Sequence, residues 1–347
     1  MMRSAQPART VAVALAAVVI QFVLVTAYMW SSARLAPRDL PIAVAGPRSA
    51  VTAVTRQIAR EDPGAFRVIV SASPSGARRD ITGRRVYGAI IVGGKTPQLL
   101  TASAASPVVA QLLTQVVDKM ARVSSPVRDI VPIDSNDPRG AAFGAMLLPL
   151  VVTSIIAGAL LTLMISVVAW RLAGLALFTI GGAAALAAAA KIWLGILPGD
   201  YFTLAGVIGL IALAVAATVT GLGSLAGTRG RATIGIALGA VITFALGNPF
   251  AGATSAPELL PRPWGTIGQW LPPGAGATLL RAVEYFHGAR AGEPWAVLAA
   301  WAGGGIALIM LSAGLARRAT SERVVAAAEA SIVAAGPSQQ AEHGHGS

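Results

Sequence analysis

The chain has 347 residues, of which 55% are hydrophobic and 12% are charged, whereas soluble domains carry about 25% charged residues. This composition excludes an ordinary water-soluble protein and predicts an integral membrane protein. The net charge of +12 does not predict a nucleic-acid partner, because the basic residues gather in residues 31–140 and at the ends of apolar segments, not in one stripe beside aromatic side chains. The sequence has no cysteine, so disulfides, iron–sulfur clusters and thiol chemistry are excluded.

Six apolar segments are predicted to cross a bilayer, whose core requires about 20 apolar residues in a helix. They lie at 11–30, 143–169, 172–197, 201–225, 232–246 and 295–316. The first is longer than the apolar core of a typical secretory signal, so we expect an uncleaved anchor. The predicted fold class is an all-α membrane bundle of six transmembrane helices, with an extracytoplasmic α/β domain inserted between the first and second helices.

The inserted domain is predicted to cover residues 31–140. Runs rich in Val, Ile and Leu predict strands, and apolar residues at helical spacing predict helices between them. The strands are expected at 40–45, 66–71, 86–92 and 98–102, and the helices at 48–60 and 107–122. The rest of the chain divides into an N-terminal anchor (1–30), a five-helix transmembrane domain (141–318) and a cytoplasmic tail (319–347) that is expected to be disordered from about residue 335.

The basic residues of the short connections predict the orientation, because such loops stay in the cytoplasm. Arg171, Arg229 and Arg231 fall on one side, whereas the opposite turn at 198–200 has no Lys or Arg. We therefore expect a multi-pass protein of the plasma membrane with both termini in the cytoplasm.

A proline-rich segment follows the fifth apolar segment. Residues 247–273 contain prolines at 249, 257, 261, 263, 272 and 273, so they cannot form one spanning helix. We expect an external re-entrant or surface loop at 247–276. An amphipathic helix is then predicted at 277–287 on the outer surface, with Leu279, Leu280, Val283 and Phe286 facing lipid.

Two motifs imitate catalytic or nucleotide sites. The stretch 89–96 resembles a phosphate-binding loop, but Ala89 replaces its first glycine and Pro97 follows, so a strand and a turn are predicted. The stretch 221–224 resembles a membrane-protease serine motif, yet no histidine lies in any predicted span to act as a base. We expect no enzyme activity.

Other candidate sites are also weak. His287, His343 and His345 do not converge as metal ligands, so we expect neither a metal nor a cofactor. The predicted spans contain no Asp or Glu, which disfavours ion-coupled transport. Lys191 is interpreted as an anchor at a helix end in preference to a substrate contact.

Gly235 and Gly239 form a G-x-x-x-G pattern on the fifth apolar segment. Such a pattern permits close helix packing. Packing within the bundle and a dimer face are both open interpretations.

Three features carry a resemblance to a known family. They are the layout of an anchor, an external domain and five spans; the external stretches 84–92 and 99–105; and the loop stretches 247–254, 258–261 and 270–274. Together they resemble the membrane subunit of ABC-2 type transporters, and more closely actinobacterial permeases similar to phage-infection-protein-like (Pip-like) membrane proteins.

The resemblance implies a permease that forms a homodimer or heterodimer in membrane lipids and is driven by a separate ABC ATPase. Its expected role is the export of a hydrophobic or amphipathic substrate that the sequence does not identify. The contact with the ATPase would involve the following residues of the short connections: Trp170, Arg171, Leu172, Arg229 and Arg231. The external loop residues that would border the exit path are Asn248, Pro249, Glu258, Trp264 and Pro272. A structural plug is the alternative for the loop, and an accessory membrane protein that binds a partner without transport is the alternative for the whole chain.

Overall fold

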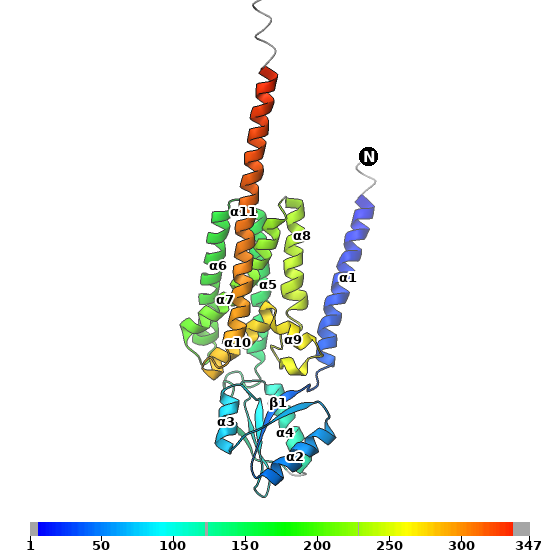
Figure 1. The fold of residues 1–347 in the computed structure, drawn as a ribbon, viewed down its shortest axis with the longest axis vertical. Coiled ribbons are helices and arrows are strands. Elements are labelled where there is room, and N and C mark those ends of the chain that lie inside the picture. Colours follow the sequence, from blue (N-terminus) through cyan, green and yellow to red (C-terminus); the bar gives the residue numbers. More distant parts are fainter. Residues whose placement is uncertain (1–5, 122–123, 228, 336–347) are drawn as a thin grey trace, which may run out of the picture.

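The computed structural model describes residues 6–121, 124–227 and 229–335. The tail that is expected to be disordered begins at about residue 335, so all but its first residue lie outside these ranges. Figure 1 shows two parts stacked end to end, a set of long helices and a sheet covered by shorter helices.

Five of the described helices are long and apolar enough to cross a membrane. They are α1 (Gln6–Ala33), α5 (Ala141–Met164), α6 (Val168–Ala188) with its π-helical extension η1 (Ala189–Trp193), α7 (Tyr201–Leu225) and α11 (Gly292–Ala335). The fifth predicted span, 232–246, consists of α8 (Arg229–Ala240) and the π-helical η2 (Val241–Leu246), whose apolar part covers only residues 231–246. An α-helix of that length rises about 24 Å, less than the bilayer core of about 30 Å.

The bundle is centred on α7. Its side chains at Ile208, Ile211 and Val215 are fully buried, and α5, α6, α8, α10 and α11 pack around it. The helix α1 stands apart from this bundle, and none of the 18 residues of its most apolar stretch is buried. Its C-terminal end reaches the rest of the chain, where the Tyr28 and Phe244 rings lie 6.4 Å apart. In the structure α1 is an anchor beside the bundle, so a bundle that includes all six predicted helices is not confirmed.

The glycine pattern of α8 faces α7 of the same chain. A Cβ atom at Gly235 would lie 2.2 Å from the carbonyl oxygen of Leu222, and one at Gly239 would lie 2.9 Å from the Cα of Val219. These distances are too short for any side chain, so the two helix backbones touch because both residues are glycine. In the structure these glycines therefore pack within the bundle, which is one of the two interpretations of the pattern.

The sheet has five strands in the order β2-β1-β3-β4-β5, and only the β3–β4 pair is antiparallel. The strands are β1 (Leu40–Ala45), β2 (Phe66–Val70), β3 (Gly88–Ile91), β4 (Gln98–Thr101) and β5 (Val127–Asp129). The four predicted strands are confirmed to within two residues, and β5 is an additional strand. The false phosphate-loop motif at 89–96 covers the end of β3 and the turn to β4, which confirms its interpretation as strand and turn.

Helices cover both faces of this sheet domain (residues 40–129). The helices α2 (Arg48–Glu61) and α4 (Pro107–Ala121), both predicted, pack on the face that carries Ile42, Val44 and Ile90. The unpredicted helix α3 (Pro74–Thr82) packs on the other face with Ala43 and Ala89. Alternation along the strands places apolar side chains on both faces.

The proline-rich segment lies between the sheet domain and the helices. It contains the 3-10 helix η3 (Pro257–Leu259) and the short α9 (Trp264–Gln269), and α10 (Pro272–Phe286) follows. Backbone hydrogen bonds tie it to the chain after α1, where the amides of Ala36 and Arg38 donate to the carbonyls of residues 259 and 258 at 3.0 Å.

The prediction that α10 faces lipid is wrong. Leu279, Leu280 and Phe286 are at most 3% exposed, because they pack against the α5–α7 core and the sheet domain. An amphipathic pattern shows that one face of a helix is apolar, but it does not distinguish burial in lipid from burial in protein.

Candidate functional site

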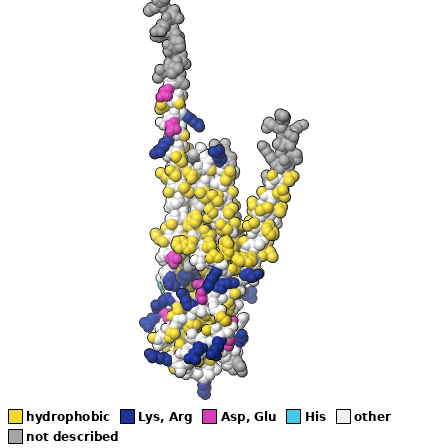
Figure 2. Space-filling model, turned by 45° about the vertical axis from the view of Figure 1, so that its right-hand side comes forward, with side chains coloured by type: hydrophobic (Ala, Val, Ile, Leu, Met, Phe, Trp, Pro, Cys, Tyr) yellow, Lys and Arg dark blue, Asp and Glu magenta, His cyan; other side chains and the backbone are white. Residues whose placement is uncertain are grey.

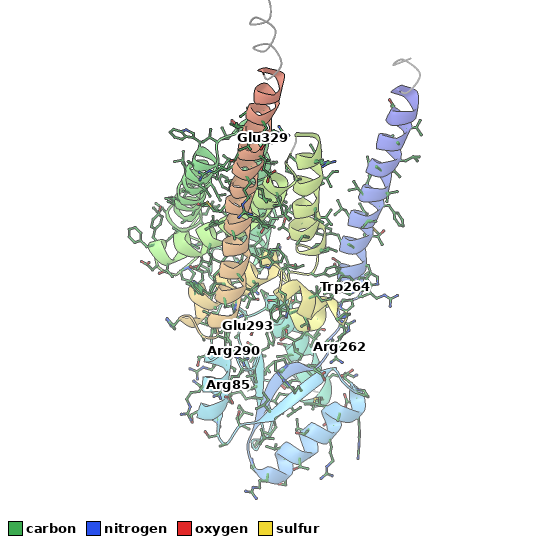
Figure 3. The ribbon with its side chains drawn as sticks, turned by 45° about the horizontal axis from the view of Figure 1, so that its top comes forward. Arg85, Arg262, Trp264, Arg290, Glu293 and Glu329 are labelled. Atoms are coloured by element: carbon green, nitrogen blue, oxygen red, sulfur yellow. The ribbon has the colours of Figure 1, made fainter. Side chains whose placement is uncertain are left out.

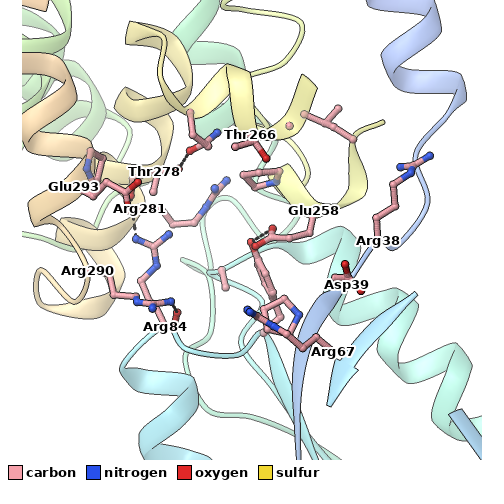
Figure 4. A pocket seen from close by; sticks show the side chains of 18 of the residues that line it. Arg38, Asp39, Arg67, Arg84, Glu258, Thr266, Thr278, Arg281, Arg290 and Glu293 are labelled. Atoms are coloured by element: carbon pink, nitrogen blue, oxygen red, sulfur yellow. Dashed lines mark hydrogen bonds between the residues drawn. The ribbon is translucent and has the colours of Figure 1, made fainter. Parts of the chain in front are cut away.

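A cavity of about 550 Å³ lies where the sheet domain meets α9, α10 and the start of α11 (Figure 4). We call it the arginine cavity. Its charged lining consists of six arginines and three carboxylates, namely Arg38, Arg67, Arg84, Arg262, Arg281, Arg290, Asp39, Glu258 and Glu293. Figure 3 shows Arg262, Arg290 and Glu293 where the sheet domain meets the helices, far from Glu329 near the other end of α11.

Arg281 on α10 is the most buried of these charges, with 6% exposure. Its Nη2 donates to the carbonyl oxygen of Ala253 at 2.8 Å, and its Cζ lies 4.8 Å from the centroid of the Phe143 ring. Among the described residues, no carboxylate oxygen lies within 4.0 Å of its guanidinium. Burial and the nearby Arg84 lower the pKa of Arg281 to about 10, so it remains a cation at neutral pH.

Arg84 reaches the same cavity from the turn that follows α3. Its Nη1 donates to the carbonyl oxygen of Thr278 on α10 at 3.1 Å, and its Cζ lies 5.4 Å from the centroid of the Phe286 ring. Arg290 in turn donates to the carbonyl oxygen of Arg84 at 3.3 Å. Arginine contacts therefore join the sheet domain to the helices that follow the proline-rich segment.

Two of the three carboxylates already have partners. The Oε2 of Glu258 accepts a hydrogen bond from the Tyr87 hydroxyl at 2.7 Å, and burial together with Glu258 raises the pKa of Tyr87. Asp39 pairs with Arg262. Since six arginines face three carboxylates, the cavity keeps an excess of positive charge that favours an anionic ligand.

An apolar groove of about 410 Å³ lies on the bundle between α7, η2 and α11. Its lining consists of Thr218, Leu222, Ile242, Ala300, Trp301, Gly304, Gly305 and Leu308. Trp301 connects this groove to the arginine cavity, because its Nε1 donates at 2.8 Å to the carbonyl oxygen of Trp270, which lines that cavity.

The predicted ATPase contacts lie at the end of the bundle away from the sheet domain, where α5 joins α6 and α7 joins α8. Trp170 is 70% exposed, and Arg231 is also exposed. Arg171 is occupied within the chain, because its guanidinium donates to the Thr162 and Ile165 carbonyls and to the Ser224 hydroxyl. Leu172 is half-buried. The side chain of Arg229 lies outside the described residues.

Of the five residues predicted on the external loop, one lines the arginine cavity. Glu258 lines the arginine cavity, whereas Trp264 stacks on Phe250 with ring centroids 4.7 Å apart. Asn248 and Pro249 lie in the turn after η2, and Pro272 begins α10. The sequence contained one signal for the cavity that was missed, the cation Arg281 in the middle of an apolar helix face.

A second buried charge lies on α10, one turn beyond the cavity. The Oε2 of Glu284 accepts a hydrogen bond from the backbone amide of Gly199 at 2.9 Å. Lys191 donates to the carbonyls of Pro198 and Gly199 in the same turn, so it lies at a helix end and contacts the backbone. Burial raises the pKa of Glu284 above its usual value of 4.5.

We expect Glu284→Gln to change how stability depends on pH. A carboxyl whose pKa is raised by folding binds its proton more tightly in the folded state, so its destabilising effect at neutral pH disappears as the pH falls through the raised pKa. The variant should therefore melt at a higher temperature than the parent at pH 7, and the difference should shrink towards pH 4.5. Thermal melts of both proteins in detergent test this, and a constant difference across that range would contradict it.

No protein-family model, curated protein or solved structure matches this chain. Within the described ranges, no group of three or more His, Cys, Asp or Glu residues is placed to hold a metal ion. The features that point to a function are therefore the arginine cavity, the apolar groove and the exposed connections at the opposite end.

Proposed function

We propose that this chain is the permease subunit of an ABC-2 type exporter, powered by a separate ATPase, that moves an amphipathic substrate out of the cell. The observation that carries the proposal is the succession of an apolar groove and a charged cavity along α11. A path with both characters suits a substrate that has an apolar and a polar part.

The distribution of charge supports an orientation for this permease. Arg171 and Arg231 lie at the end of the bundle opposite the sheet domain, and basic residues of short connections stay in the cytoplasm. The proposal therefore places the sheet domain and the arginine cavity outside, with the exposed connections facing the cell interior.

Energy has to come from a partner. A bound ligand shifts a conformational equilibrium only if it binds the two states with different affinity, and ATP binding by an ATPase at the cytoplasmic end would supply that difference. Trp170 and Arg231 are the exposed candidates for this contact. Arg171 is a weaker candidate, because its donors are used inside the chain.

The test is copurification of the full chain with an ABC ATPase encoded beside it. We expect the double variant Trp170→Ala, Arg231→Glu to lose about nine-tenths of the bound ATPase, since exposed aromatic and arginine side chains dominate many interfaces. Trp193→Ala is the matched control, because Trp193 is 82% exposed but lies at the other end of its helix. Equal loss in the control would contradict the proposed contact.

The accessory-protein alternative predicts a different outcome. If the parent chain binds no ATPase and shows no ATP-dependent transport in vesicles, the permease proposal fails. A partner captured only through the sheet domain would then favour the accessory function.

A further inference from the structure

The arginine cavity and the apolar groove follow each other along one face of α11. Pro294 lines the cavity, whereas Trp301 and Leu308 line the groove. Residues seven apart share one face of an α-helix and are separated by about 10 Å along its axis. The hydrogen bond from Trp301 to the Trp270 carbonyl lies where the two spaces meet.

We infer that the two spaces form one binding site for an anionic amphiphile, with a phosphate group held by Arg84 and Arg281 and an acyl chain lying in the apolar groove. That this amphiphile is the exported substrate rests on the proposed function. That the site binds it does not depend on an ATPase.

The arginines carry the argument for a phosphate group. Arg281 makes one hydrogen bond to protein in the described ranges, to Ala253, and Arg84 makes one through its side chain, to Thr278. Each guanidinium has five donors in a planar fork that matches phosphate oxygens. The remaining donors of two neighbouring cations have no carboxylate within 4.0 Å among the described residues, so they are available to an anionic group.

The groove carries the argument for an acyl chain. Leu222, Ile242 and Leu308 give it an apolar wall, and burying methylene groups against such a wall is favourable. Figure 2 shows a band of Lys and Arg side chains where the apolar surface of the helices ends. Lipid headgroups lie at the corresponding level of a bilayer, so a lipid phosphate and its chain would reach the cavity and the groove together.

The headgroup test measures the binding of short-chain dioctanoyl phosphatidic acid, below its micellar concentration, to the full chain in detergent. We expect Arg281→Met and Arg84→Met each to raise the Kd about tenfold or more, because hydrogen bonds to charged groups are the strong ones. Arg85→Met is the matched control, since Arg85 is adjacent in sequence but pairs with Asp80 at 2.8 Å and does not line the cavity. Its Kd should stay within about twofold of the parent value.

The chain test uses two neighbouring glycines. A Cβ atom added at Gly303 or at Gly304 would meet open space, but only Gly304 lines the groove. Gly304→Leu should weaken phosphatidic acid severalfold and leave the binding of inorganic phosphate unchanged, whereas Gly303→Leu should affect neither. Dioctanoyl phosphatidylcholine should bind the parent more weakly than phosphatidic acid, because its headgroup carries no net charge.

Several outcomes would overturn the inference. Equal binding of phosphatidic acid and phosphatidylcholine, or an unchanged Kd in Arg84→Met, would exclude the phosphate contact. Equal affinity for inorganic phosphate and phosphatidic acid would identify a free anion as the ligand and exclude the acyl chain. Thermal melts confirm folding of each variant, and the half-buried Arg84 keeps the test decisive if Arg281→Met does not fold. Loss of ATPase copurification with intact lipid binding would refute only the permease.

Discussion

Replacing Gly235 with alanine is expected to lower the free energy of unfolding by about 1–3 kcal/mol, the usual range for overpacking. The added Cβ would lie 2.2 Å from the Leu222 carbonyl oxygen and 2.6 Å from its carbonyl carbon. Both are backbone atoms, so α8 and α7 have to separate along their contact. Unfolding of the detergent-solubilised protein by SDS, followed by tryptophan fluorescence, measures the loss.

The control for this prediction is Gly206→Ala on α7. A Cβ atom at Gly206 has no neighbour within 4 Å, so only the gain in helix propensity remains, about 1 kcal/mol in favour of alanine. Opposite signs at the two glycines are therefore expected. If Gly235→Ala instead dissociated a dimer and left the unfolding of each chain unchanged, the dimer-face interpretation would be correct.

Replacing Arg171 with methionine is expected to cost about 2–4 kcal/mol, because it removes three hydrogen bonds from a charged donor. Two of the acceptors, the carbonyls of Thr162 and Ile165, lie at the C-terminal end of α5. Carbonyls at a helix end lack partners within the helix, and a cation there also interacts favourably with the helix dipole. Arg171 thus joins the ends of α5, α6 and α7.

Two comparisons separate this role from partner binding. Ser224→Ala removes only the contact to α7 at 2.9 Å, so it should cost about 1 kcal/mol. Trp170→Ala should leave stability within about 0.5 kcal/mol of the parent, because its side chain is exposed. A similar loss in Trp170→Ala and Arg171→Met would show that the connection as a whole, and not the guanidinium, holds the helices.

The hydrogen bonds of Arg171 also limit what a binding experiment at this connection can show. Arg171 falls in a short basic connection, which indicates a cytoplasmic loop and a candidate dock for a partner. Its hydrogen bonds to Thr162 and Ser224 give it a structural task as well. Loss of ATPase binding after changing Arg171 would therefore not identify a dock, whereas the same loss at Trp170 and Arg231 would.

The sequence by itself determined most of the elements. The apolar stretch at 201–225 coincides with α7 and the strand at 40–45 with β1, because span length and the enrichment of β-branched residues are local properties of the chain. Local patterns failed where the element is short or weakly apolar, as for β5 at Val127–Asp129, whose three residues are all exposed.

Only the tertiary structure decided which surfaces meet. The pattern of α10 required an apolar partner but did not specify whether that partner is lipid or protein, and packing against the core decided for protein. The arginine cavity gathers Arg38 and Arg290, which lie far apart in the sequence, just after α1 and just before α11. Charges become a site when folding brings them to one place and limits their contact with water, and neither condition is encoded in the residues next to them.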